Sequence, residues 1–292
     1  ELRRRAVKAA SERDPEALWQ ITEAYLVSKG KVRTNLSEHT LRSYRYAVKV
    51  LTEYWEGENL LRPSRDAGDV FILDLEDAGH SVSTIRTRVA GVRALYRALR
   101  WAGATEARPF EDVALPQDPA PAPAKRYPYP EQAIARLLAK ADAVDRALIL
   151  LGAHGGLRIA ETLALLWEDV DLEAGELTVQ RGKGRKQRTV FFGPTLSSAL
   201  ALLKASQSPD AVRVIPFTTD VQARRRLQAL CALAGVRYRG THALRHHAGT
   251  KLAKEKELHV VSSHLGHENV STSEIYVKWN RREELRSSVG KW

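Results

Sequence analysis

The sequence predicts a mainly α-helical protein of two domains, the second of which includes a small antiparallel β-sheet. Three observations support this: apolar residues recur at helical spacing along most of the chain, a proline-rich segment divides it, and two short β-rich runs flank a basic turn. Of the 292 residues, 43% are hydrophobic and 28% charged, which is typical of a globular protein with a packed core. The composition excludes a chain that is disordered throughout.

The first domain is predicted to be all-helical and to span residues 1–115. Its apolar side chains lie three and four positions apart, with polar side chains on the remaining faces. This pattern predicts helices over residues 18–27, 40–54 and 83–101.

A linker is predicted between the domains. Six prolines fall between Leu115 and Pro130. Because proline lacks a backbone N–H and its ring clashes with the preceding helical turn, this stretch cannot form a helix. We therefore predict a semi-rigid linker over residues 116–130 and a second domain over residues 131–292.

The second domain is predicted to contain helices interrupted by one β-hairpin. Two helices fit residues 131–156, and a third is expected over residues 158–167, just after a Gly-Gly turn. Two β-rich runs, 176–180 and 188–192, are joined by RGKGRKQ, which predicts a hairpin with a basic tip. Helical spacing then returns over residues 195–206, 219–234, 242–254, 259–265 and 271–278.

The chain is strongly basic, with 46 Lys and Arg against 35 Asp and Glu, a formal net charge of +11 and a pI near 9.8. Such a balance favours an anionic partner. Most of the positive excess lies in the second domain. In the first domain, basic residues on two predicted helices fit either a binding face or a solvated surface. They are Arg42, Arg45, Arg86 and Arg88.

No apolar run approaches the roughly 18–20 residues that a membrane helix needs, so we expect no membrane partner. The N-terminal segment ELRRRAVKAA is charged, and we expect a cytoplasmic protein. The single cysteine, Cys231, excludes an internal disulfide and fits a small buried side chain. The sequence holds no methionine, so we expect that it lacks residues of the native chain.

Four residues of the second domain have the chemistry to bind one phosphate group and to move a proton beside it. Arg158 follows a Gly-Gly pair at a predicted helix start, and Lys183 lies between two glycines of the hairpin tip. His242 and Arg245 are three positions apart, so they share one face of a helix. Two guanidinium groups and an ammonium group can clamp a phosphate, and a histidine can donate or accept a proton there.

Two further residues extend this candidate site. His267 and Tyr276 lie on either side of a turn in HLGHENVSTSEIYV, which brings a phenol within reach of the same phosphate. A phenol with a pKa near 10 is a weak nucleophile at neutral pH. It therefore needs a base and dense positive charge nearby, and the predicted site offers both.

The order of these motifs resembles that of the tyrosine site-specific recombinases of the phage integrase family, and of Xer-type members in particular. In the second domain the motifs are GLRIAETLALLWEDVDL, GKGRKQR, HALRH and LGHENVSTSEIY. In the first domain SEHTLRSYRYAVKVLTEYW and SVSTIRTRVAGVRALYRAL are similar to the family more weakly. The resemblance covers about residues 15–280. The interval from Arg245 to His267 is about one residue shorter than the family leads us to expect.

The resemblance implies a role for each matching residue. Tyr276 is the implied nucleophile, which forms a 3′-phosphotyrosine with DNA and releases a 5′-hydroxyl. The implied partners are Arg158 and Arg245 on the non-bridging oxygens, Lys183 as general acid, His242 in proton transfer, His267 on the phosphate and Glu161 in support. From the basic helix faces and the basic hairpin tip we expect DNA contacts at Arg42, Arg45, Arg86, Arg88, Arg185 and Lys186.

The resemblance also implies an assembly. The first domain would be a core-binding domain that clamps double-stranded DNA, and the second the catalytic domain, with four protomers joining two DNA sites. Because the phosphotyrosine retains the energy of the broken bond, no cofactor is expected. The sequence leaves open whether a second recombinase or an accessory translocase takes part, and whether the reaction resolves chromosome dimers or integrates a mobile element.

Other functions fit parts of the sequence. A type IB topoisomerase shares the same chemistry, and a non-catalytic DNA-binding regulator could retain the clamp. His242 and His246 have the spacing of a zinc-binding pair, but the sequence lacks an HExxH motif and nearby cysteines, so we expect no metal. GKGRK is not a P-loop, because Gly184 rather than Ser or Thr follows Lys183.

Overall fold

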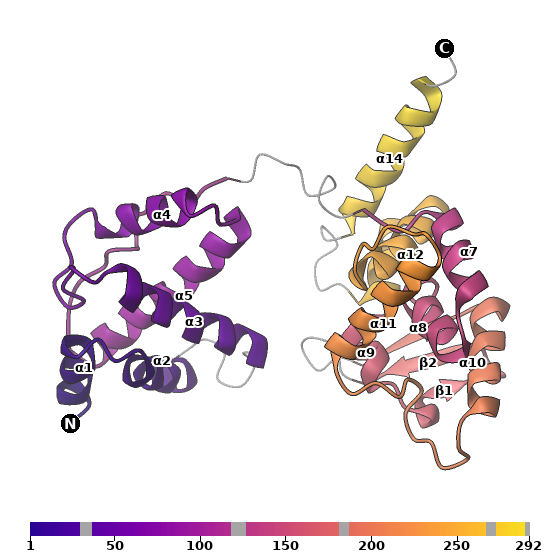
Figure 1. Ribbon diagram of the computed structural model, residues 1–292, viewed down its shortest axis with the longest axis horizontal. Coiled ribbons are helices and arrows are strands. Elements are labelled where there is room, and N and C mark those ends of the chain that lie inside the picture. The colour runs from indigo at the N-terminus through magenta and orange to yellow at the C-terminus, as the bar shows by residue number, and fades with distance from the viewer. Residues whose placement is uncertain (30–36, 118–126, 181–186, 267–272, 290–292) are drawn as a thin grey trace. The chain divides into compact units, whose positions relative to one another are not determined.

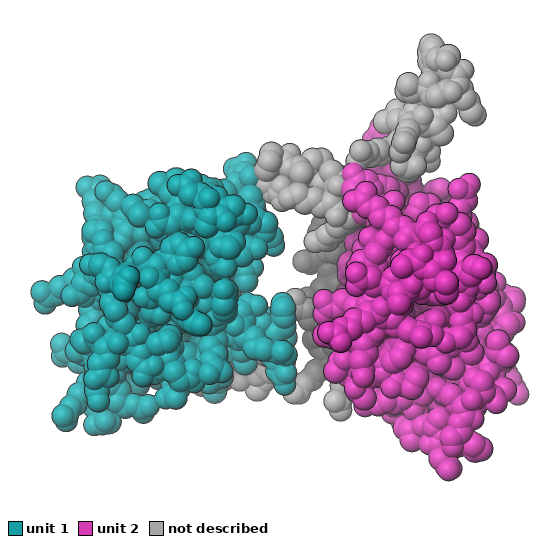
Figure 2. Space-filling model, in the orientation of Figure 1, with its two compact units in different colours: residues 1–119 teal, residues 120–292 magenta. Residues whose placement is uncertain are grey.

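The computed structural model describes residues 1–29, 37–117, 127–180, 187–266 and 273–289, with side chains up to residue 281 (Figure 1). The chain forms two compact units, Glu1–Pro119 and Ala120–Trp292 (Figure 2). Both units are mainly helical, and the second contains a three-stranded antiparallel sheet. The predicted fold class is therefore confirmed. No helix among the described residues has the length and apolar character needed to cross a membrane.

The first unit is built from helices alone in the part that the structure describes. The three predicted helices are confirmed as α2, α3 and α5, and α1 and α4 lie outside the predicted segments. Helix α1 buries only alanines, and α4 begins without a side-chain cap, so neither gave a strong signal in the sequence. Their bounds are α1 (Leu2–Ser11), α2 (Pro15–Lys29), α3 (Glu38–Tyr54), α4 (Ala67–Asp77) and α5 (Val82–Trp101).

Helices α3 and α5 both begin with a serine N-cap. The Ser37 hydroxyl accepts a hydrogen bond from the Thr40 backbone N–H at 3.2 Å, and the Ser81 hydroxyl accepts one from Thr84 N–H at 3.2 Å. Each serine satisfies one of the N–H groups that a helix start leaves without an internal partner. The two caps fix where these helices begin.

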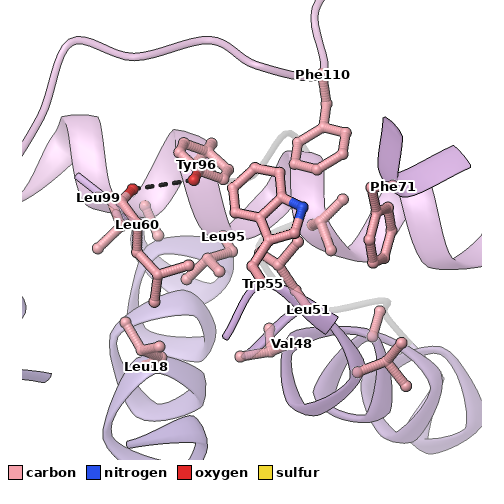
Figure 3. Packing of buried hydrophobic residues seen from close by; sticks show 14 of the residues in the cluster. Leu18, Val48, Leu51, Trp55, Leu60, Phe71, Leu95, Tyr96, Leu99 and Phe110 are labelled. Atoms are coloured by element: carbon pink, nitrogen blue, oxygen red, sulfur yellow. Dashed lines mark hydrogen bonds between the residues drawn. The ribbon is translucent and has the colours of Figure 1, made fainter. Parts of the chain in front are cut away.

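An aromatic cluster forms much of the first unit's core (Figure 3). The Trp55 and Phe110 rings stack with centroids 5.4 Å apart, and Phe71 meets Phe110 edge-on at 5.6 Å. The Tyr96 hydroxyl donates to the Leu60 carbonyl oxygen at 2.9 Å. These contacts hold the segments after α3 and after α5 against α5 itself.

Three arginines of α5 bind the backbone of the segment that follows this helix. Arg86 donates to the Pro116 carbonyl oxygen at 2.9 Å, Arg93 to that of Phe110 at 2.7 Å and Arg100 to that of Ala107 at 2.8 Å. The segment 107–116 therefore runs back along α5.

The second unit packs helices around a small sheet. The sheet order is β1-β2-β3, and Val170 pairs with Leu177, which in turn pairs with Val190. The elements before the sheet are α7 (Glu131–Lys140), α8 (Ala143–Ala153), α9 (Ile159–Ala164) and a 3-10 helix (Trp167–Asp169). The sheet itself comprises β1 (Val170–Asp171), β2 (Glu176–Val179) and β3 (Arg188–Phe191). It is followed by α10 (Pro194–Ser206), α11 (Asp220–Leu233), α12 (His242–Glu255), α13 (Leu258–Leu265) and α14 (Glu274–Val289).

Most predicted elements of this unit are confirmed, with differences at the edges. The helix predicted over residues 158–167 ends at Ala164, because the chain becomes extended at Leu165 before a short 3-10 turn. Strand β1 pairs only two residues, too few for a period to show in the sequence. Helix α14 begins at Glu274 rather than at residue 271.

The end of the predicted linker belongs to the core of the second unit. Tyr129 is fully buried, and its hydroxyl accepts from the Arg239 backbone N–H at 2.8 Å. The Tyr129 carbonyl oxygen lies 2.7 Å from Nδ1 of His247 on α12. Cys231 is 1% exposed beside the Tyr129 hydroxyl, which confirms its predicted burial. The domain boundaries at 115 and 130 remain a prediction.

Candidate active site

The first predicted site residue, Arg158, immediately precedes helix α9 as its N-cap. The Arg158 backbone N–H and one of its guanidinium N–H groups each donate to the Glu161 carboxylate at 2.8 Å. Gly156 makes the preceding turn with φ of +69°, and a Cβ there would lie 2.5 Å from Leu265. The Gly-Gly pair thus lets the chain pass close to α13 and turn into α9. The Arg158 side chain remains 33% exposed, so its guanidinium can meet a ligand.

Arg245 lies on α12 at the centre of the site, with its side chain 1% exposed. Its two terminal nitrogens donate to the Gly156 and Leu265 carbonyl oxygens, both at 2.6 Å. Burial lowers the pKa of this guanidinium to about 10, and the nearby charge of Arg158 adds to the effect. Arg245 therefore remains a cation at neutral pH, already oriented by fixed acceptors.

Glu161 is the acidic centre of the cluster, with its side chain 4% exposed. Burial favours the neutral acid, but hydrogen bonds from Arg188 and Arg158, with the charge of Arg188, lower the pKa of the Glu161 carboxyl to about 2. One Glu161 oxygen also lies 3.8 Å from the Arg245 guanidinium. A single carboxylate thus faces three arginines, and the group keeps a net positive charge that suits a phosphate.

Tyr276 lies on α14, 3% exposed, with its ring against α12. A Cβ on Gly249 would lie 2.5 Å from Cζ of the Tyr276 ring, so only a glycine leaves room for the ring at this place. The His246 ring lies 5.6 Å from the Tyr276 ring and 4.7 Å from the His242 ring, centroid to centroid. A phenolate at Tyr276 would raise the pKa of Arg245, as expected for neighbouring groups of opposite charge.

The structure brings together five predicted residues from three helices. They are Arg158 at the N-cap of α9, Glu161 on α9, His242 and Arg245 on α12, and Tyr276 on α14. Four further predicted residues lie outside the described residues: Lys183, Arg185, Lys186 and His267.

Two residues at the site were not predicted. His246 contacts the rings of both His242 and Tyr276, and its position one helical turn after His242 is the signal that could have found it. Arg188 binds Glu161 through both terminal nitrogens, at 2.9 and 2.8 Å. In β3, Arg188 and Val190 alternate with exposed Thr189 and Phe191. A charged residue on the inward face of a strand indicates a buried partner of opposite charge.

Two of the four arginines predicted to form a basic face on the first unit make short polar contacts within the protein. Arg45 pairs with Glu16 at 2.6 Å, and Arg86 binds the Pro116 carbonyl. Arg42 is 76% exposed, with a longer contact of 3.4 Å to Glu38. Arg88, by contrast, is only 8% exposed, with its guanidinium 5.6 Å from the Tyr46 ring centroid. Arg88 is therefore less accessible to a surface phosphate than Arg42, and its DNA contact stays a prediction.

A hollow of about 510 Å³ lies between the first turns of α3 and α5. Its walls include His39, Thr40, Ser83, Arg86 and Thr87. These residues belong to the first two turns of the helices that Ser37 and Ser81 cap.

Two family models match the chain. Residues 130–283 match the phage integrase family, and residues 30–103 match the N-terminal SAM-like domain of phage integrases. The tyrosine recombinase XerC of Vibrio cholerae is 30% identical over 283 residues, covering 90% of this chain and 89% of the relative. The tyrosine recombinase XerA of Thermococcus kodakarensis is 27% identical, covering 91% and 92%.

Solved structures share the fold. A XerH site-specific recombinase bound to a palindromic difH substrate aligns with a TM-score of 0.71 at 19% identity, covering 96% of this chain and 85% of that one. A lambda integrase dimer bound to a core site aligns with a TM-score of 0.71 at 14% identity, covering 89% and 76%.

The chain therefore belongs to the phage integrase family. Within it the chain is a Xer-like tyrosine recombinase, an enzyme that cleaves and rejoins DNA at specific sites. The topoisomerase and the non-catalytic regulator, both weighed from the sequence, are not favoured by these relatives.

Proposed function

We propose that Tyr276 is the nucleophile of this recombinase. The phenol oxygen attacks the scissile phosphorus, the bond from phosphorus to the 5′-oxygen breaks, and a 3′-phosphotyrosine forms. The observation that carries this proposal is the position of Tyr276, which packs on the same helix that presents Arg245 and His242. Attack by a 5′-hydroxyl of another strand reverses the step and joins new partners.

Arg158 and Arg245 are proposed to stabilise the negative charge that grows on the non-bridging oxygens. Both side chains are held by fixed acceptors before any DNA arrives, so little reorganisation is needed at the moment of reaction. Arg158 is the more exposed of the two and is expected to meet the phosphate first.

Proton transfers are proposed for the remaining residues. His242 takes up the phenol proton. The His246 ring contacts both the His242 ring and the Tyr276 ring, and we propose that it supports this transfer. Lys183 donates a proton to the departing 5′-oxygen, and His267 binds the phosphate. Both roles rest on the family resemblance of the sequence.

Double-stranded DNA is the proposed partner, held by the domain of residues 1–115, the linker 116–130 and the catalytic domain 131–292. Arg42, Arg45 and Arg86, with Arg185 and Lys186 of the hairpin tip, are proposed to meet phosphates. The lambda integrase dimer bound to DNA is one precedent for assembly in the family. For this chain we propose a tetramer on two DNA sites.

A covalent trap tests the nucleophile. The protein is incubated with nicked genomic fragments of its source, stopped with detergent and digested, and the DNA that stays bound is sequenced. Wild type is expected to retain one short inverted-repeat site, and Tyr276→Phe none. Tyr54→Phe is the matched control, since Tyr54 is an exposed tyrosine of the first unit. Adducts with Tyr276→Phe would overturn the assignment, and adducts scattered over all sequences would favour a topoisomerase.

The recovered site then tests the assembly. Mass measurement of Tyr276→Phe with that DNA is expected to give four protomers on two duplexes. A complex that never exceeds two protomers on one duplex would contradict the tetramer. Recombination of a two-site plasmid by the purified chain alone would show that neither a second recombinase nor a translocase is required.

A further inference from the structure

Three arginines converge on the carboxyl end of helix α13, and each binds a different carbonyl oxygen of three consecutive residues. Arg188 Nε lies 3.1 Å from His264 O, an Arg245 terminal nitrogen 2.6 Å from Leu265 O, and an Arg158 terminal nitrogen 3.3 Å from Gly266 O. The last carbonyls of a helix lack internal partners and carry partial negative charge, so three cations there are favourable. The same three arginines share Glu161 on their other side.

Arg188 differs from the other two arginines in how completely it is engaged. Its terminal nitrogens bind both Glu161 oxygens and its Nε binds His264 O, so all three nitrogens of the guanidinium have fixed acceptors. Its side chain is 11% exposed, against 33% for Arg158. Such a bidentate pair fixes the plane of both groups, which suits a role in orientation.

The turn after α13 is packed directly on Arg188. Gly266 ends the helix with φ of +64°, and a Cβ there would lie 2.9 to 3.1 Å from three atoms of the Arg188 side chain. The guanidinium therefore lies against the backbone of the turn. Strand β3, helix α9 and the end of α13 meet at this one side chain.

We propose that Arg188 is a positioning residue for the recombination reaction. Arg188 holds Glu161 and the end of α13 in place, so that Arg158 and Arg245 present their guanidinium groups to the scissile phosphate. Without Arg188, the Glu161 carboxylate has only Arg158 and Arg245 as charged partners and draws them toward itself. This inference rests on the proposed function, because it concerns the phosphate that Arg158 and Arg245 bind there.

The chain offers a matched control for the loss of such a pair. Arg226 binds Asp145 through Nε at 2.7 Å and a terminal nitrogen at 2.9 Å, and Asp145 is 3% exposed. This pair lies in the same unit, between α11 and α8, and a terminal nitrogen of Arg226 also binds Asp142; among the described residues no hydrogen bond or ion pair joins Arg226 to the arginine cluster. Arg226→Gln therefore removes a comparable bidentate pair outside the site.

The first test compares cleavage of two DNA substrates in single turnovers. One has an ordinary scissile phosphate, and the other a neutral methylphosphonate, in which a methyl group replaces a non-bridging oxygen. We expect Arg188→Gln to reduce cleavage of the phosphate about 100-fold, since small misplacements of catalytic groups have effects of this size. On the methylphosphonate the reduction should shrink to about threefold or less, because there is less charge for the arginines to stabilise.

Each outcome decides one point. Arg226→Gln should cleave both substrates as wild type does. The cleavage rate of Arg188→Lys should lie between those of Arg188→Gln and wild type, because a lysine keeps the positive charge but cannot form the bidentate hydrogen bonds of a guanidinium group. An equal loss on both substrates, or no loss on either, would overturn the inference. A wild type that forms no adduct would instead overturn the proposed function.

The second test does not need activity. The Glu161 carboxyl is titrated by carbon-13 NMR in the full chain, with Glu161→Gln to assign its signal. Arg188→Gln should raise the pKa of Glu161 clearly, and Arg226→Gln should leave it unchanged. An unchanged Glu161 pKa in Arg188→Gln would overturn the positioning role even if the protein proved inactive.

Discussion

Gly249 determines where the ring of Tyr276 can lie. It stands one helical turn after Arg245 on α12, where any Cβ would lie within 2.7 Å of three ring atoms. Real side chains do not approach so closely, so any side chain at position 249 would displace the ring. The position of the proposed nucleophile is thus defined by a residue that has no side chain.

We predict that Gly249→Ala reduces covalent adduct formation about 100-fold, because the tyrosine ring must shift by about 1 Å or more. Alanine favours a helix by about 1 kcal/mol over glycine, so the backbone itself is not expected to suffer. Adduct yield and melting temperature measure the two effects separately. Gly193→Ala is the control, because a Cβ there meets nothing within 4 Å. Normal adduct formation by Gly249→Ala would refute this account.

Glu161 links the site to the protein's stability in acid. Its folded pKa of about 2 lies below its ordinary value of 4.5, so the stabilisation is fully present above pH 4.5 and is lost as the pH falls toward 2. The difference corresponds to about 3 kcal/mol. We predict that Glu161→Gln is less stable than wild type at pH 7 and loses less stability on going to pH 3.

Urea unfolding at pH 7 and pH 3 measures this difference. Glu173→Gln serves as the control, since Glu173 is an exposed carboxylate beside the sheet. Wild type and Glu161→Gln losing the same free energy between these two pH values would contradict the assigned pKa.

At the scale of elements, serine caps fix the starts of α3 and α5, the two helices that carry the proposed DNA contacts of the first unit. Ser81→Ala leaves one N–H group of α5 without its partner, and we predict a loss of about 1 kcal/mol in the free energy of unfolding. Ser83→Ala, two positions further along the same helix, is the control, with an expected change below about 0.5 kcal/mol. Chemical denaturation monitored by tryptophan fluorescence suits the measurement, because Trp55 and Trp19 are buried in this unit. Equal effects of the two substitutions would show that the cap is not the cause.

Element prediction succeeded for the long amphipathic helices and missed α1, α4 and the two-residue strand β1. Helices α3 and α5 could be located from the sequence because they run for 17 and 20 residues with one apolar face. The helix predicted over residues 158–167 stops early, because contacts of Leu165 and Trp167 with the segment 212–214 pull the chain into an extended path. These contacts join residues far apart in the sequence, which a local pattern cannot reveal.

At the scale of the whole molecule, a net charge of +11 is expected to make DNA binding strongly dependent on salt. A protein that neutralises several phosphates loses affinity steeply as salt rises, and each lost contact reduces the slope of log affinity against log salt by about 1. We predict that Arg42→Ala reduces this slope, while Arg88→Ala leaves it unchanged and lowers the melting temperature instead. Fluorescence anisotropy over a range of salt concentrations checks the first effect. A reduced slope for Arg88→Ala would instead support the predicted DNA contact of this buried arginine.

The sequence by itself determined the fold class and the family and predicted the set of Arg158, His242, Arg245 and Tyr276, because these rest on local periodicity and on the order of short motifs. Only the tertiary structure decided which charges pair. It placed Arg188 on Glu161, buried Arg88 under Tyr46 and seated the Tyr276 ring on Gly249. Each of these outcomes depends on contacts between distant segments, and burial and pairing, rather than residue type, determine what a charged side chain can do.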